Sequence, residues 1–337
     1  MGEGKRYPTI YDVAERANVS IGTVSKALNT PARVAEPTRR RVLDAVAELN
    51  FVPKAAATSR ARKGVGRIGV FAPFSSFESF HQRLNGVLLA TSTAASAIEV
   101  VVFDVESAAE SARALESLPS LRSLDGLIIM SVPFGEKPAA AMRRARMPVV
   151  LVDLEGHGFP SVTTDDKTGG ALAADRLITT GRRHLAFLGH SQVQQDHLSA
   201  SLRRFDGFSQ RVADHGVDLP PSRVLLVPRG FDATVAGIEA LLRDQPDIDG
   251  IFAHTDELAA IAQLAVRADG RRVPEDVAVI GFDDGSTAVA ADLTTVRQEL
   301  RESGRWAAAT LLNLLADPDR VTPSLTLPVS LVRRGSA

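Results

Sequence analysis

The chain of 337 residues has no cysteine, a single tryptophan and only two tyrosines. Without cysteine it has no disulfide, no thiolate nucleophile and no cysteine-ligated zinc site. It also lacks any apolar run near the roughly 20 residues that a membrane-spanning helix requires. Because the charged N-terminus has no signal-peptide pattern, we expect a soluble, cytoplasmic protein.

Charge is unevenly distributed along the chain, although the formal net charge is only −1. Residues 1–63 hold 12 Lys and Arg against 6 Asp and Glu, and the other 274 residues carry a charge of −7. A basic segment joined to an acidic body is expected where one end of a protein approaches nucleic-acid phosphates. The hydrophobic fraction of 45 % allows two or three domains.

Residues 9–29 predict two short helices around a tight turn, the pattern of a helix-turn-helix. Thr9 suits the cap of the first helix, Asn18 the left-handed backbone of the turn, and Ser20 the cap of the second helix. The small, polar and basic residues on the second helix suit the major groove of DNA. The alternative is an ordinary helical hairpin with solvated polar faces. The residues expected to face inward are Ile10, Val13, Ala14, Ala17, Val24 and Leu28.

A third helix is predicted from Glu36 to about Asn50, where Pro37 suits the first turn. Three helices in this span are enough for a small DNA-binding head, which we place at residues 1–53. Residues 54–66 are basic and rich in alanine, and we interpret them as a hinge or linker.

From Arg67 onward, apolar and β-branched runs alternate with helical patterns. Continuously apolar strands predict parallel sheets buried on both faces, and the number of strands favours two sheets over one. The predicted strands are 68–74, 100–105, 126–132, 149–153, 184–189, 224–227, 250–253 and 277–282. The predicted helices include 82–97, 168–180, 202–214, 232–242 and 256–268.

Polar or aromatic residues follow many of these strands, at the edge where open α/β sheets bind ligands. We expect them to converge on one crevice if the two sheets face each other. The alternative, which we favour for Asp256 and Asp284, is that they cap helices or form strand-end turns. The residues are Phe74, Ser75, Ser76, Phe77, Asp104, Asp153, His190, Thr255, Asp256, Asp283 and Asp284.

The stretch from Thr9 to Asn29 resembles the signature of the LacI/GalR family of bacterial transcription regulators. The likeness continues, in order, through residues 50–53, 67–70, 203–208, 279–284 and 293–298. It implies an α/β protein: an all-α helix-turn-helix head, then a core that resembles the periplasmic sugar-binding proteins, 67–337. This core would hold two doubly wound parallel-sheet subdomains, about 67–163 with 294–323, and about 164–293 with 324–337.

The same resemblance implies a sequence-specific transcriptional regulator, which we expect to be a repressor. Its partners would be a near-palindromic operator in double-stranded DNA, a second copy of the chain, and a small-molecule effector in the cleft between the subdomains. We expect the effector to be a mono- or disaccharide. A nucleoside or purine is the second choice, and some family members respond to a phosphorylated protein instead.

The family's operator-reading positions match Ile21, Gly22 and Lys26. Ile21 would contact a thymine methyl group, and Lys26 would donate to guanine. Gly22, without a side chain, would let the helix backbone approach the DNA closely. Arg60 stands where the family's hinge helix commonly presents a leucine wedge, and an arginine enters a narrow minor groove by electrostatics. The residues expected to hold phosphates and fix the register are Tyr11, Ser20, Thr23, Ser25 and Asn29, and Arg33 is a further candidate for DNA contact.

For the effector site, the resemblance pairs Arg204 with Asp283. The guanidinium offers several N–H donors and the carboxylate two acceptor oxygens, which together suit vicinal sugar hydroxyls. A surface salt bridge is the alternative for Arg204. Phe231 matches an aromatic residue that stacks on the ligand, and Phe71 is assigned to the core. The other expected effector contacts are Phe74, Phe77, Asp153, Thr255 and Gln298.

No enzymatic pattern is complete in this sequence. Residues 64–69 satisfy GxGxxG, but a strand follows them where a dinucleotide site needs one before. A phosphate-binding P-loop and a nucleophile elbow are absent, and the seven histidines show no metal-ligand spacing. We therefore expect no enzyme activity, cofactor or metal. The alternative function is a cytoplasmic sugar-binding or sugar-metabolising protein with a DNA-binding head.

Overall fold

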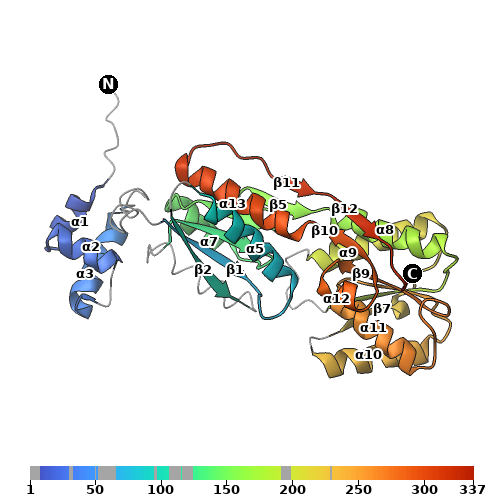
Figure 1. Cartoon of the computed structure of the whole chain (residues 1–337). Helices are drawn as coiled ribbons and strands as arrows, with labels where there is room; N and C mark the ends of the chain where they lie inside the picture. Colours follow the sequence, from blue (N-terminus) through green and yellow to red (C-terminus); the bar gives the residue numbers. More distant parts are fainter. Residues whose placement is uncertain are drawn as a thin grey trace. The chain divides into compact units, whose positions relative to one another are not determined.

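The structure is a computed structural model that describes residues 8–29, 33–49, 51, 66–94, 97–105, 115, 124–190, 199–227 and 230–337. The chain divides into two compact units, each made of two segments. Unit 1 comprises Met1–Val162 and Gly304–Ser324, and unit 2 comprises Thr163–Ser303 and Leu325–Ala337. The path of the chain can be followed by colour in Figure 1.

Three helices at the start of the chain form a head with a hydrophobic core of its own: α1 (Ile10–Arg16), α2 (Ile21–Asn29) and α3 (Glu36–Glu48). The predicted turn is confirmed, since Asn18 has φ 51° and Ser20 Oγ accepts the Thr23 backbone N–H at 3.1 Å. At the start of α1, Asp12 Oδ2 accepts the Thr9 backbone N–H at 2.5 Å. The predicted inward residues are also confirmed: Val13, Ala14, Ala17, Val24 and Leu28 are buried, and Ile10 packs against them.

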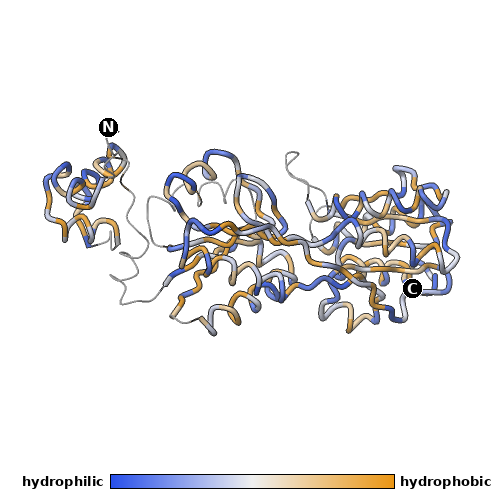
Figure 2. Tube along the Cα trace, turned by 90° about the horizontal axis from the view of Figure 1, so that it is seen from above, coloured by the Kyte–Doolittle hydropathy of each residue, from blue (hydrophilic) through white to orange (hydrophobic). Residues whose placement is uncertain are grey.

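Unit 1 also contains most of a six-stranded sheet with the order β11-β5-β4-β3-β1-β2. Its strands are β1 (Gly66–Ala72), β2 (Ile98–Asp104), β3 (Gly126–Met130), β4 (Val149–Val152), β5 (Ser161–Thr164) and β11 (Leu325–Leu327). The strands β2, β1, β3, β4 and β5 pair in parallel, and the apolar residues of β1 and β3 are fully buried. Figure 2 shows this pattern, with hydrophobic strands and hydrophilic connections.

The helices that pack on this first sheet are α5 (Ser79–Ser92), α7 (Glu136–Arg144) and α13 (Leu300–Ala316). The backbones of α5 and α13 touch, because a Cβ added at Gly304 would lie 1.9 Å from the Arg83 carbonyl oxygen. This contact holds α5, which follows the carboxyl end of β1, against α13.

Unit 2 holds the second six-stranded sheet, with the order β12-β10-β9-β8-β6-β7. Its strands are β6 (Leu185–His190), β7 (Val224–Val227), β8 (Gly250–Ala253), β9 (Ala278–Asp283), β10 (Thr294–Gln298) and the antiparallel β12 (Val329–Val332). The sequence places residues 294–303 in the first subdomain, whereas the structure groups them with unit 2, because β10 pairs with β9.

Helices cover both faces of the second sheet, as a doubly wound fold requires. They are α8 (Asp166–Thr179), α9 (Ala200–Asp214), α10 (Phe231–Asp244), α11 (Asp256–Ala268) and α12 (Ser286–Ala290). Residues of α8 and α9 share one buried cluster with Phe187, Phe252 and Phe282 of the sheet. Residues of α10 and α11 share another with Ala186 and Leu188. Each of the eight predicted strands has a counterpart in the structure, whereas β5, β10, β11 and β12 were not predicted.

The helices α8 and α9 cross with their backbones in contact. A Cβ added at Gly170 would lie 2.0 Å from the Arg204 carbonyl oxygen, and one added at Gly207 would lie 2.0 Å from the Lys167 carbonyl oxygen. Only glycine fits at both positions. This close crossing places Asp166, the first residue of α8, beside the arginines of α9.

We expect Gly170→Ala to destabilise unit 2 by about 2–3 kcal/mol, because the clash is with backbone atoms and outweighs the better helix propensity of alanine. Urea denaturation of the full chain would measure the change. Gly135→Ala is the matched control, since a Cβ there meets nothing within 4 Å. Equal stability of the two variants would contradict the close crossing.

Candidate functional site

The outer surface of α2 presents the three residues predicted to read operator bases. Ile21 is 40 % exposed, and Gly22 and Lys26 are exposed as well. The nearest atom to a Cβ placed on Gly22 is Ser20 Oγ, at 3.8 Å, so the backbone here is accessible. Since Val24 and Leu28 occupy the opposite face, the sequence of α2 separates a structural side from a side that contacts solvent.

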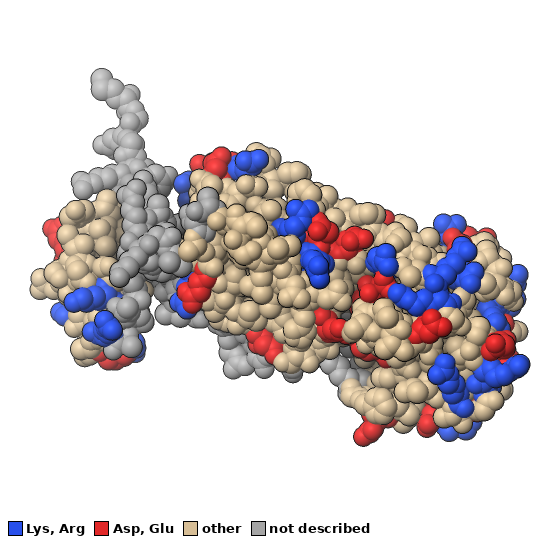
Figure 3. All heavy atoms as spheres, viewed as in Figure 1, with Lys and Arg blue, Asp and Glu red and all other residues tan. Residues whose placement is uncertain are grey.

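The other residues predicted to contact DNA differ in their surroundings. Tyr11 is 68 % exposed on α1 and Arg33 is exposed, whereas Ser25 is half-buried. The hydroxyls of Ser20 and Thr23 lie 2.9 Å apart and bond to each other, so both also serve the start of α2. Figure 3 shows Lys and Arg side chains on the surface of the head. The side chain of Asn29 and all of Arg60 lie outside the described residues.

In unit 2, Arg204 lies at the centre of a buried network. Its Nε donates to Asp166 Oδ1 at 2.8 Å, and its Nη1 donates to the His254 carbonyl oxygen and lies 3.7 Å from Asp283 Oδ1. The guanidinium also stacks 3.6 Å above the Phe282 ring. Arg204 is only 5 % exposed, so the alternative of a surface salt bridge is wrong.

Three other predicted effector residues adjoin this arginine or its partners. Gln298 Nε2 donates to Asp283 Oδ1, and Gln298 Oε1 accepts from Thr164 Oγ1 at 3.0 Å. Thr255 caps α11, because its hydroxyl accepts the Leu258 backbone N–H at 3.3 Å. All three lie at the carboxyl ends of β8, β9 and β10. The structure therefore gathers Arg204, Asp283, Gln298 and Thr255 at one edge of the second sheet.

Phe231 is not brought into this hydrogen-bonded network among the described residues. It begins α10 and is 60 % exposed. His190, which ends β6, lies with its ring 5.0 Å from the His254 ring. The cluster thus extends along the sheet edge toward β6.

The two aspartates that the sequence suggested as caps or turn residues have separate roles. Asp284 binds Arg297 Nε and Arg334 Nη2, both at 2.6 Å, and ties the strand ends together. Asp256 is buried and accepts from Thr295 Oγ1 at 2.5 Å and from the Gly285 backbone N–H at 2.9 Å. Burial, with the nearby Asp283 charge, raises the pKa of Asp256 to about 8.

This raised pKa predicts a pH-dependent stability. Between an unfolded pKa of 3.8 and a folded pKa of about 8, the folded protein keeps a proton that the unfolded chain releases. The contribution of Asp256 to the free energy of unfolding is therefore highest below pH 4. It falls by about 1.4 kcal/mol per pH unit as the pH rises from 4 to 8. We expect Asp256→Asn to remove this part of the slope in urea denaturation at pH 5, 6 and 7. The exposed Asp218→Asn should leave the slope unchanged, and equal slopes in all three proteins would contradict the assignment.

In unit 1, aromatic and charged residues gather beyond the carboxyl ends of β1 and β4. Phe74 is buried and Phe77 half-buried, and both rings contact the Phe80 ring, at 6.4 and 6.1 Å between centroids. Phe71 stacks on Phe103 inside the core, as predicted. Asp153 is buried and pairs with Arg83 of α5, while its Oδ1 is buried without a hydrogen-bond partner among the described residues.

Sequence reasoning missed Arg83, Asp166, Arg203 and His254, although each lies in one of these clusters. Arg203 and Arg204 both bind Asp166, which follows β5. Because β5 reads Ser-Val-Thr-Thr, it lacks the apolar run that marked the other buried strands, and Asp166 two residues beyond it drew no attention. His254 directly precedes Thr255 at the end of β8, so the strand-end rule that selected Thr255 could have found it.

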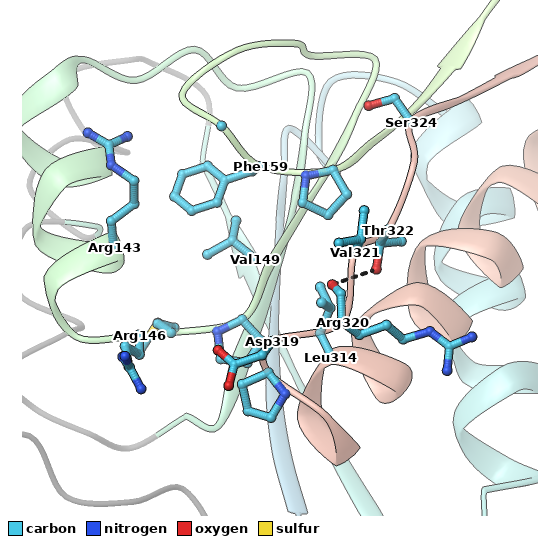
Figure 4. A pocket seen from close by; sticks show the side chains of 15 residues that line it. Arg143, Arg146, Val149, Phe159, Leu314, Asp319, Arg320, Val321, Thr322 and Ser324 are labelled. Carbon is cyan, nitrogen blue, oxygen red and sulfur yellow. Dashed lines mark hydrogen bonds between the residues drawn. The ribbon is translucent and has the colours of Figure 1, made fainter.

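Unit 1 has a further hollow of about 460 Å³, shown in Figure 4. Val149, Phe159 and Leu314 line its apolar part, and Arg143, Arg146 and Arg320 lie around it. Val149 begins β4, whereas Asp153 follows the end of that strand. The hollow therefore lies at the opposite edge of the sheet from the predicted effector residues.

Comparison with known proteins agrees with both parts of the chain. Residues 9–54 match the family described as bacterial regulatory proteins of the lacI family, and residues 174–337 match the periplasmic binding protein-like domain. The HTH-type transcriptional regulator CelR of Thermobifida fusca is 30 % identical over 339 residues, covering 98 % of this chain and 96 % of CelR. The chain belongs to the LacI family. The ribose operon repressor of Halalkalibacterium halodurans is also 30 % identical, over 97 % of this chain and 96 % of that protein.

Solved structures of LacI-family proteins have the same fold. The CelR–cellobiose complex has a TM-score of 0.71 and 27 % identity, covering 98 % of this chain and all of that one. The lac repressor dimer bound to operator and the anti-inducer ONPF has a TM-score of 0.70 and 25 % identity, covering 98 % and 99 %. This LacI-family chain is a DNA-binding transcriptional regulator. Among its described residues, no helix is long and apolar enough to cross a membrane.

Proposed function

We propose that this LacI-family regulator represses transcription by binding a near-palindromic operator as a homodimer, and that a mono- or disaccharide controls this binding. The observation that carries the effector assignment is the buried network of Arg204, Asp283 and Gln298 at the carboxyl ends of the second sheet. A fork of donors beside carboxylate and amide oxygens matches the hydroxyl groups of a sugar. The cellobiose complex of CelR supports this ligand class by analogy.

The DNA contacts that we propose follow from α2. Ile21, Gly22 and Lys26 would enter the major groove, and Tyr11 and Arg33 would hold the flanking backbone. The exposed face of α2 and the family match of residues 9–54 support this assignment. Contacts by Arg60 and Asn29 are proposed from the resemblance alone.

A full-length thermal-shift screen of mono- and disaccharides tests the effector proposal directly. A sugar present at 100 times its dissociation constant should stabilise the protein by about 2.7 kcal/mol. The same sugar should then change the affinity for operator DNA in a gel-shift or anisotropy assay. A sugar that binds without changing operator affinity would contradict control by that ligand.

For the homodimer, unit 2 offers apolar side chains that its own fold leaves exposed. Leu264 of α11 and Val289 of α12 are both more than half exposed, and these two helices pack against each other. We propose that a second copy of the chain covers them, as the lac repressor dimer suggests by analogy. A buried carboxylate without a partner is costly in such an interface.

We therefore expect Leu264→Glu and Val289→Glu to weaken self-association at least tenfold in analytical ultracentrifugation. Val321→Glu is the matched control, because Val321 is also exposed but lies in unit 1. A dimer of unchanged strength in both unit 2 variants would exclude these residues from the interface.

A further inference from the structure

Two polar atoms near Arg204 are buried without a hydrogen-bond partner among the described residues: His254 Nε2 and Ser201 Oγ. Both side chains are more than nine-tenths buried. Buried polar atoms are normally paired, because leaving one unpaired costs about 1–3 kcal/mol. Each such atom therefore needs a specific explanation.

The two residues belong to the same cluster as Arg204. Ser201 and Arg204 are three residues apart and both lie on the buried face of α9. The carbonyl oxygen of His254 accepts from Arg204 Nη1. A Cβ added at Gly189 would lie 2.9 Å from Ser201 Oγ, and the next residue, His190, contacts the His254 ring. The unpaired atoms thus adjoin the edge where β6 and β8 end.

The chemistry of these atoms selects a hydroxyl group as their partner. Burial, with smaller effects of His190 and Arg204, holds the pKa of His254 well below its usual range, so the imidazole is neutral. A neutral imidazole nitrogen donates or accepts according to its tautomer, and a serine hydroxyl does both. A ligand hydroxyl satisfies each of them in either role, whereas a carboxylate only accepts and an ammonium only donates.

Among the residues that the structure describes, the ion pairs of this cluster match each cation with a carboxylate. Arg203 and Arg204 face Asp166 and Asp283, two cations against two carboxylates. An anionic ligand would have to approach these buried carboxylates, and both arginines described here already have a carboxylate partner. An uncharged ligand meets no such penalty.

We infer that His254 and Ser201 are specificity-determining residues of the effector site and that the effector they bind is an uncharged, hydroxyl-bearing molecule. The inference rests on the proposed function, which places the effector beside Arg204. It adds two binding residues that neither the family match nor the sequence assigned, and it agrees with the neutral sugar of the proposed function.

The experiment uses the full chain with ribose, galactose and cellobiose as neutral probes, and with glucose 6-phosphate and gluconate as anionic probes. Calorimetric titration gives the dissociation constant of each probe that produces a thermal shift. We expect a neutral sugar to bind, and both His254→Ala and Ser201→Ala to weaken it by about tenfold. His254→Asn, which keeps a donor and an acceptor, should restore part of the affinity. His184→Ala is the control, because His184 precedes β6 at the opposite sheet edge.

The outcomes separate the two proposals. Failure of every probe would count against a sugar effector, and so against the proposed function itself. A neutral sugar that binds both alanine variants as tightly as the wild type would overturn the role of His254 and Ser201 alone. Binding of the anionic probes only would overturn the charge class. The melting temperature without ligand shows whether each variant is folded. If His254→Ala does not fold, Ser201→Ala alone tests the proposal.

Discussion

Arg204→Ala is expected to abolish the effect of the sugar on operator binding. Allosteric coupling between two sites of a protein typically changes affinity by about 5–150-fold. Without the guanidinium, the ligand loses its principal fork of donors, and the ratio of operator affinities with and without sugar should fall to about one. Fluorescence anisotropy on a labelled operator measures both affinities. A variant that keeps the wild-type ratio would remove Arg204 from the effector site.

The structure also predicts that Arg204→Ala lowers the free energy of unfolding, so the stability of this variant must be measured as well. Arg204 is buried between Asp166 and Asp283, and breaking a buried ion pair by removing one partner costs about 3–5 kcal/mol. Arg203 still binds Asp166, so we expect a loss near the lower limit. Arg204→Lys keeps a positive charge between the carboxylates but lacks the planar fork. It should be more stable than Arg204→Ala and still respond poorly to sugar, which separates binding from folding.

Lys26→Ala is expected to weaken binding to the specific operator by about 10–100-fold, the usual contribution of a good base contact of 1–3 kcal/mol. Lys26 is exposed on α2, on the side away from the buried Val24 and Leu28. Binding to unrelated duplex should fall only a few-fold, because one phosphate-attracting charge is lost among many. Competition gel shifts with operator and random duplex at one salt concentration give both values.

The control for Lys26 is Lys167→Ala, which removes the same charge from α8 of unit 2. It should leave both affinities unchanged. Equal losses on operator and random duplex for Lys26→Ala would instead assign this lysine to a phosphate contact.

Several elements were predictable because their signal is local. The helices of the head, the turn at Asn18 and the eight apolar strands follow from periodicity and capping within short windows. The strands β5 and β10 were missed because their residues are mostly Thr, Ser, Arg and Gln, which lack the apolar run of a buried strand. They are strands because neighbouring strands pair with them, which is information from elsewhere in the chain.

The amino-acid order alone determined that a basic helical head precedes an α/β core, since charge, capping residues and hydrophobic period are properties of neighbouring residues. Only the tertiary structure decided the partners of the buried charges. Arg83 meets Asp153 across 70 positions, and Arg204 meets Asp166 because α8 and α9 cross in contact at Gly170 and Gly207. A buried ion pairs with whichever opposite charge the fold brings close to it, and the separation of two residues in the sequence does not predict that pairing.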